Sequence, residues 1–224
     1  MNGDEALLQR IAEWLRAAVP VGVGVAVGRV GPFAPFDARE AAAVAQSVVR
    51  RREAFATGRH LARAALAGLG CPPCAILPDG DGVPCWPSGF TGTISHSGRL
   101  CIALAAPGSA SEGIGVDIEL AARVLPSIRR LVCHPEASQC AVEYDVALCF
   151  SAKEAVFKAR YPAMRKMLGF HDVQLEMSPI RERFVARIAG DGQPGQGAEA
   201  RICGSSTRIG EHVLADAWTR KDEY

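Results

Sequence analysis

The stretch Gly115-Val116-Asp117-Ile118-Glu119 predicts a strand with one apolar and one acidic face. Because successive side chains of a strand point to opposite faces, we expect Val116 and Ile118 in the core. Asp117 and Glu119 then share the other face, about 7 Å apart, where they repel each other unless a cation lies nearby. Magnesium suits such a pair, since it takes oxygen ligands and keeps several waters. A solvent-exposed strand face is the alternative interpretation.

A second informative stretch, Lys153-Glu154-Ala155-Val156-Phe157-Lys158, lies in a run with helical spacing of apolar residues. Glu154 and Lys158 are four residues apart and therefore share one stripe of the helix. Glu154 is a candidate third metal ligand or base, and Lys158 a candidate phosphate contact. Two structural alternatives stay open: a surface salt bridge worth about a few tenths of a kcal/mol, or a capping box of Ser151 and Glu154 at a helix start.

Groups that bind phosphate form a third cluster. In the strand-like stretch Gly92-Thr93-Ile94-Ser95-His96-Ser97, adjacent Ser95 and His96 face opposite ways and cannot form a nucleophile–base pair. Phosphate binding by hydroxyl and imidazole is the functional interpretation, and a hydrogen-bonded polar turn is the alternative. Arg51 and Arg59 are suited to a terminal phosphate, because a guanidinium matches phosphate oxygens bidentately. The solvated face of a helix explains this basic segment equally well.

The overall composition narrows the functional class. Twenty-five Lys and Arg residues against 24 Asp and Glu give a net charge of +1, which argues against a nucleic-acid binder. The sequence lacks a run of about 18 apolar residues and a basic, apolar leader, so we expect a cytoplasmic protein that does not span a membrane. Eight cysteines do not suggest a disulfide framework in such a chain, and the Cys71-Pro72-Pro73-Cys74 pair has no second pair to complete a zinc site.

The hydrophobic patterns predict an α+β fold in two halves, residues 1–108 and 109–224, joined by a small-residue linker at 107–112. Asp37 with Glu40 predicts a capped helix start, Gly70 a helix end, and Pro162 the end of the long helix. We expect strands at 19–30, 93–95, 100–106, 113–120, 173–177, 184–188 and 212–217, helices at 38–56, 59–69, 128–131 and 137–161, and a hairpin loop at 190–198. The two halves suggest a pseudo-duplication, although no internal sequence repeat is evident.

Six segments within residues 20–190 occur in an order and spacing that is specific as a set. They are Arg51-Arg52 with Phe55, the run from Gly58 to Leu66, Pro84-Cys85-Trp86-Pro87, Gly92 to Ser97, Gly115 to Glu119, and Phe150 to Ala159. Together they resemble the 4'-phosphopantetheinyl transferases of the surfactin/enterobactin synthetase-activating class. The bacterial subgroup with the Trp-Pro segment and a stretch like Leu168-Gly169-Phe170 is the most similar.

The resemblance implies transfer of phosphopantetheine from coenzyme A to a serine of an acyl or peptidyl carrier protein, by a monomer with coenzyme A between two pseudo-symmetric α/β halves. By position, Asp117, Glu119 and Glu154 correspond to the Mg²⁺ ligands, and Glu154 and Lys158 to the catalytic groups. The implied coenzyme A contacts are Arg51, Arg59 and His96 on the 3'-phosphate, with Ser95, Lys153 and Lys158 near the other phosphates.

Two positions depart from the family pattern. Pro78 stands where many relatives have a lysine, and Val83 where they have an acidic residue, so one contact to coenzyme A is missing or replaced. Two other functions remain as alternatives: a magnesium-dependent phosphohydrolase of coenzyme A or nucleotides, and a non-catalytic module that binds carrier proteins. Hydrolysis of coenzyme A without a protein acceptor would indicate the first, and absence of magnesium-dependent coenzyme A binding the second.

Overall fold

The computed structural model describes residues 3–111, 113–133, 145–178, 182–188 and 200–219. Its helices are α1 (Gly3–Ala18), α2 (Ala38–Ala43), α3 (Val49–Ala67), α4 (Arg129–Val132) and α5 (Val146–Met164), with 3₁₀ turns at Ala121–Arg123, Pro126–Ile128 and Phe170–Asp172. Its strands are β1 (Gly24–Arg29), β2 (Phe90–Ser97), β3 (Leu100–Pro107), β4 (Ile114–Leu120), β5 (Val173–Ser178), β6 (Arg183–Ile188), β7 (Ala200–Ile209) and β8 (His212–Trp218).

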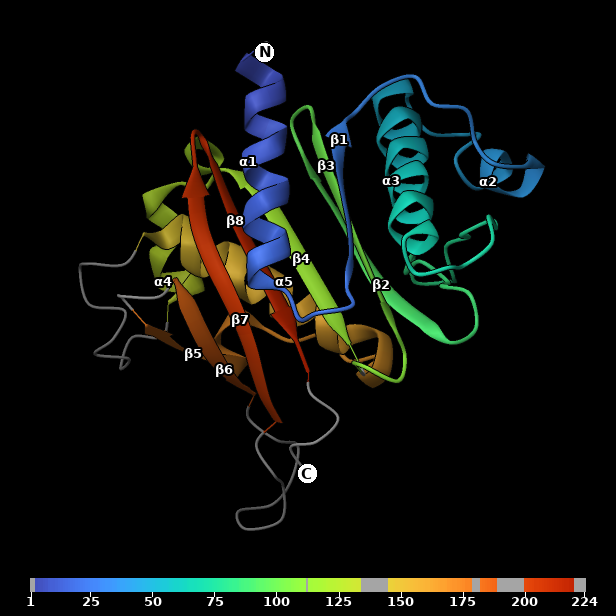
Figure 1. The fold of residues 1–224 in the computed structure, drawn as a ribbon. Helices are drawn as coiled ribbons and strands as arrows, with labels where there is room; N and C mark the ends of the chain where they lie inside the picture. The colour runs from blue at the N-terminus through green and yellow to red at the C-terminus, as the bar shows by residue number, and fades with distance from the viewer. Residues whose placement is uncertain (1–2, 112, 134–144, 179–181, 189–199, 220–224) are drawn as a thin grey trace.

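These strands form two antiparallel sheets, which confirms the predicted α+β class. One sheet has three strands in the order β1-β3-β2, and the other has five in the order β4-β8-β7-β6-β5. Helix α3 covers the three-stranded sheet, and α5 covers one face of the five-stranded sheet while α1 lies on the other (Figure 1). The pseudo-symmetry of the two halves stays a prediction.

One hydrophobic core joins the two sheets. It contains Ile11 of α1, Ile102 of β3, Ile118 of β4 and Leu214 of β8, all fully buried. Two smaller cores lie beneath α3 and beneath α5. Because burial of apolar area is the main stabilising term, the shared core fixes β3, and with it the paired strand β2, relative to β4.

Glycines on β4 allow α5 to pack directly onto the strand. A Cβ added at Gly115 would lie 1.9 Å from the carbonyl oxygen of Ala155, and one at Gly113 would lie 2.0 Å from that of Ala159. Any larger residue there would force the helix away from the strand. The first glycine of the acidic strand motif therefore has a steric function, which is to bring the polar side chains of α5 close to those of β4.

Side-chain hydroxyls of β2 join the edges of the two sheets. Alternate residues of β2 accept hydrogen bonds from alternate backbone N–H groups of β4, as the carbonyls of a neighbouring strand would. The pairs, with N···O distances of 3.2, 3.4 and 3.2 Å, are Val116 with Thr93, Ile118 with Ser95, and Leu120 with Ser97. This β2–β4 junction places the acidic residues of β4 directly beside the serines of β2.

Most of the predicted strands are confirmed, but the helical boundaries needed correction. The predicted helix at 38–56 is wrong, because α2 ends at Ala43 and α3 begins at Val49. Gly58, where we expected a break, lies inside α3, where an added Cβ would come within 2.9 Å of Ile94. Pro162 lies in the last turn of α5 rather than ending it. Residues 137–144 and 190–198, part of the predicted long helix and the predicted loop, lie outside the described residues.

Candidate active site

The carboxylate of Asp117 is the centre of a buried polar cluster at the β2–β4 junction. Only 6% of the residue is exposed. One carboxylate oxygen, Oδ1, accepts from Lys158 Nζ at 2.7 Å and from Ser95 Oγ at 3.0 Å, and Oδ2 accepts from Ser151 Oγ at 2.9 Å. Val116, its neighbour in β4, is buried in the core as predicted. A carboxylate with three side-chain donors is fixed in orientation.

The ammonium group of Lys158 is equally well ordered. Besides Asp117, it donates to Ser95 Oγ at 3.0 Å and to the backbone oxygen of Val116 at 3.1 Å, so all three of its N–H bonds are used. Its side chain remains 27% exposed. The group is therefore a fixed positive charge that an incoming anion can still reach.

The other two predicted acidic residues lie on either side of this cluster. Glu154 is half-buried, and burial, together with the nearby charge of Asp117, raises its pKa, although Lys158 opposes the shift. Helix α5 begins at Val146, so Glu154 does not belong to a capping box at its start. Glu119 accepts from Ser97 Oγ and from the backbone N–H of Leu120.

These carboxylates fit a magnesium ion in chemistry, but the structure does not gather them around one point. Among the described residues, no three His, Cys, Asp or Glu side chains come close enough together to hold a metal ion. The Lys158 ammonium provides the positive charge beside Asp117. Three carboxylates are nevertheless the hard oxygen donors that magnesium prefers, and Asp117 and Glu154 disfavour each other's charge.

The predicted 3'-phosphate contacts lie on α3 and β2. Arg59 is buried, donates from Nε to the carbonyl of Ile76 at 3.0 Å, and stacks 4.1 Å from the Phe55 ring centre. Burial lowers its pKa to about 10, so the guanidinium remains charged near neutral pH. Arg51 is exposed, and its positive charge also lowers the pKa of Arg59. The two arginines therefore influence each other directly.

His96 lies on the face of β2 opposite to Ser95, as the strand pattern predicts. Its pKa is lowered, mainly by loss of solvation. The charges of Arg51, Lys158 and Arg50 lower it further. Positive charges on α3 and α5 thus act on this imidazole, and the negative charge of Glu119 partly opposes them. These positive charges favour a ligand with several negative charges.

Lys153 does not join this cluster. Its side chain is buried, and its amine donates to the backbone oxygens of Val132 at 2.8 Å and Phe170 at 2.6 Å. These bonds join α5 to the end of α4 and to the 3₁₀ turn at Phe170–Asp172. The predicted contact of Lys153 with coenzyme A stays a prediction, and it would require those bonds to break.

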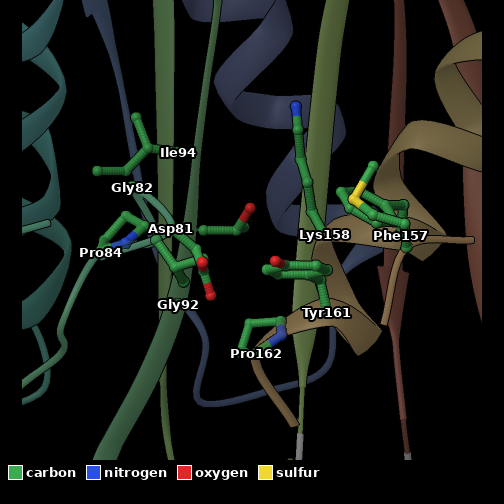
Figure 2. Close-up of a pocket in the computed structure, with 12 residues that line it drawn as sticks. Asp81, Gly82, Pro84, Gly92, Ile94, Phe157, Lys158, Tyr161 and Pro162 are labelled. Carbon is green, nitrogen blue, oxygen red and sulfur yellow. The ribbon is translucent and has the colours of Figure 1, made fainter. Parts of the chain in front are cut away.

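A pocket of about 320 Å³ opens beside Lys158 (Figure 2). Strand β2 contributes one wall, α5 another, and the loop at 81–84 a third. Its lining residues are mostly apolar: Asp81, Gly82, Val83, Pro84, Gly92, Thr93, Ile94, Phe157, Lys158, Tyr161, Pro162 and Met167. The pocket suits the uncharged, elongated part of a ligand whose charged part lies at Lys158.

Sequence reasoning missed the contributions of Ser97, Ser151 and Tyr161. Ser151 lies seven residues before Lys158, and this spacing alone predicts that the two side chains share a helix face. The alternation of Thr93, Ser95 and Ser97 was another, since three hydroxyls on one strand face need partners. Tyr161 carried no signal of its own, because its place in the pocket depends on the packing of α5 against β4.

Two family profiles match the chain on either side of residues 107–112. The profile of the 4'-phosphopantetheinyl transferase N-terminal domain matches residues 39–106, and that of the 4'-phosphopantetheinyl transferase superfamily matches residues 113–215. The 4'-phosphopantetheinyl transferase PptT of Mycobacterium tuberculosis is 37% identical over 166 residues, which cover 68% of this chain and 72% of that protein. This chain belongs to the 4'-phosphopantetheinyl transferase family.

Other members of the family are similar over shorter stretches. The 4'-phosphopantetheinyl transferase Svp of Streptomyces mobaraensis is 39% identical over 66% of this chain and 64% of its own length. Npt of Nocardia iowensis is 36% identical over 59% of this chain and 62% of its own length. Enterobactin synthase component D of Escherichia coli is 33% identical over 41% of this chain and 46% of its own length.

Among the described helices of this phosphopantetheinyl transferase, none has the length and apolar character that a membrane span requires.

Proposed function

We infer that this protein transfers the 4'-phosphopantetheine group of coenzyme A to a serine of a carrier protein and releases adenosine 3',5'-bisphosphate. Its place in the family supports this reaction. The assignment of the site rests on one observation, the hydrogen bonds that Asp117 accepts from Lys158, Ser95 and Ser151. A buried acid, a fixed ammonium and an adjoining apolar pocket match a substrate with a pyrophosphate and a long neutral arm.

We propose that coenzyme A lies between the two halves, 1–108 and 109–224. Lys158 and Ser95 would contact its pyrophosphate, and Arg51, Arg59 and His96 its 3'-phosphate. The pocket between β2 and α5 would take the pantetheine arm, because its walls are apolar and Lys158 lies at one end. Cytoplasmic location and a monomeric state stay predictions.

We further propose that the reaction uses a magnesium ion held by Asp117, Glu119 and Glu154. Such an ion would supply positive charge beside the pyrophosphate oxygens and act as a Lewis acid. The support is the chemistry of the donors, together with the mutual repulsion of Asp117 and Glu154, which a cation would relieve.

The remaining steps are the exchange of bonds at the β-phosphorus, removal of the serine proton and stabilisation of the developing charge. The carrier serine oxygen forms a bond to the β-phosphorus, and the bond from that phosphorus to the bridging oxygen of adenosine 3',5'-bisphosphate breaks. Glu154 is the candidate base for the serine proton, as the alternative to its role as third magnesium ligand; a carboxylate whose pKa is raised by burial suits that task. Lys158 exchanges one of its present acceptors for a phosphate oxygen and stabilises the developing charge.

An assay by intact mass tests this function. The protein is mixed with apo carrier proteins, coenzyme A and magnesium, and the carriers are weighed. We expect a mass gain of one phosphopantetheine group on a serine of at least one carrier. Coenzyme A hydrolysed without any carrier would instead indicate a phosphohydrolase, and the absence of magnesium-dependent coenzyme A binding would indicate a non-catalytic module.

The Lys158→Met variant tests the charge that we assign to the transition state. We expect its single-turnover rate of transfer to fall by about a hundredfold, because a fixed donor to developing charge is lost. Lys158→Arg keeps the positive charge and should retain more activity. An unchanged rate in Lys158→Met, measured by rapid quench with saturating carrier, would contradict the role given to this lysine.

A further inference from the structure

The loop at one wall of the pocket is built around Asp79. Its Oδ1 accepts from the backbone N–H groups of Asp81 at 3.0 Å and Val83 at 2.9 Å. Gly82 has a φ of +83°, a conformation that glycine adopts without strain. These bonds hold the loop in one shape, with the second carboxylate oxygen of Asp79 left to face outward from the turn.

Arg165 reaches this loop from the opposite wall. It ends α5 in the left-handed conformation, with φ 52°, and its N–H bonds to the carbonyl of Tyr161 at 2.8 Å. Its Nη1 atom lies 2.5 Å from Asp79 Oδ2 and 3.3 Å from Asp81 Oδ2. The hydrogen bond to Asp79 raises the pKa of Arg165 and lowers that of the aspartate, as expected for a formed ion pair.

These ion pairs connect the two walls of the pocket. Residues 81–84 line one side, and Tyr161, Pro162 and Met167 line the side that α5 and the chain after it provide. Figure 2 shows Asp81 and Pro84 across the pocket from Tyr161 and Pro162. Arg165 itself does not line the pocket, so its effect on a ligand would act through the walls.

We propose that Arg165, with Asp79 and Asp81, is a clasp that closes this pocket over the pantetheine arm of coenzyme A. This inference rests on the proposed function. The clasp must open when the arm enters, and again when it leaves attached to the carrier serine. Arg165 is about half exposed, and exposed ion pairs are weak, so it opens without unfolding of the walls.

Two ligands that differ by the 4'-phosphopantetheine group provide the test. Coenzyme A carries the pantetheine arm, and adenosine 3',5'-bisphosphate lacks it. In the Arg165→Gln variant we expect coenzyme A to dissociate about three- to fivefold faster, while dissociation of the bisphosphate is unchanged. The Asp81→Asn variant should show the same pattern with a smaller effect. Stopped-flow displacement measures both rates.

Arg187→Gln is the matched control, because Arg187 forms a comparable exposed ion pair with Glu176 at 2.9 Å on the outer strands β5 and β6. It should leave both rates unchanged. Equal rates for wild type and Arg165→Gln with coenzyme A, or equal acceleration of both ligands, would overturn the clasp alone. A wild-type protein that binds neither ligand would overturn the proposed function as well.

Discussion

The Asp117→Asn variant is expected to lose about a hundred- to thousandfold of its transfer rate, which corresponds to about 3–4 kcal/mol of transition-state stabilisation. Asp117 binds the Lys158 ammonium in the structure, and we propose that it also holds the magnesium ion. Asparagine keeps the size and two of the possible hydrogen bonds but removes the negative charge. Both the position of Lys158 and the affinity for the metal should therefore change.

The rate is measured by intact mass of a carrier protein at saturating coenzyme A. Thermal unfolding checks that the variant folds, because Asp117 also contributes to the β2–β4 junction through Ser95. Asp172→Asn, an exposed aspartate that caps a 3₁₀ turn, serves as the control and should retain full activity. Near-normal transfer by Asp117→Asn would remove this residue from the catalytic site.

The second large effect concerns stability and its dependence on pH. Asp216 of β8 is fully buried on the sheet face that carries α1, and burial raises its pKa to about 7, although Ser205 and Arg183 partly oppose the shift. The folded protein therefore holds a proton that the unfolded chain releases at an acidic pH. Its contribution to the free energy of unfolding is largest at low pH and falls as pH rises toward 7.

Asparagine at this position cannot titrate. From pH 5 to pH 8 the free energy of unfolding of the wild type should fall by about 3 kcal/mol relative to that of Asp216→Asn. Urea unfolding at a series of pH values measures this change, and the other titrating groups cancel because both proteins share them. Parallel pH profiles for the two proteins would show that the Asp216 carboxyl is ionised in the folded state.

The strand at residues 114–120 was predictable because alternation of apolar and acidic residues has only one low-energy arrangement when one face is buried. Strand β3 was predictable for another reason, because its continuous apolar run is typical of a strand buried on both faces. The helix N-cap at Asp37 was also local, since its carboxylate accepts from the N–H groups of Arg39 and Glu40. The candidate residues Asp117, Glu154 and Lys158 followed from spacing and from the family resemblance.

Other features depended on long-range packing. Strand β7 contains Gly204, a residue type depleted in strands, and it is a strand because β6 and β8 pair with it on both sides. Helix α1 was not predicted, and it is fixed by the core that both sheets share. The direction of Lys153, away from the cluster, is set by the carbonyls of Val132 in α4 and Phe170 in a 3₁₀ turn, which the local sequence around Lys153 does not indicate.

The sequence by itself determined the chemistry of this phosphopantetheinyl transferase: which carboxylates, hydroxyls and cations it has, and which of them share a face of one strand or one helix. That follows from the fixed periods of strands and helices. Only the tertiary structure decided that Ser95 and Ser151 would meet on Asp117 from opposite sides, with Lys158 between β2 and β4. Such meetings depend on close packing between α5 and β4, where two glycines remove the side chains that would keep the elements apart.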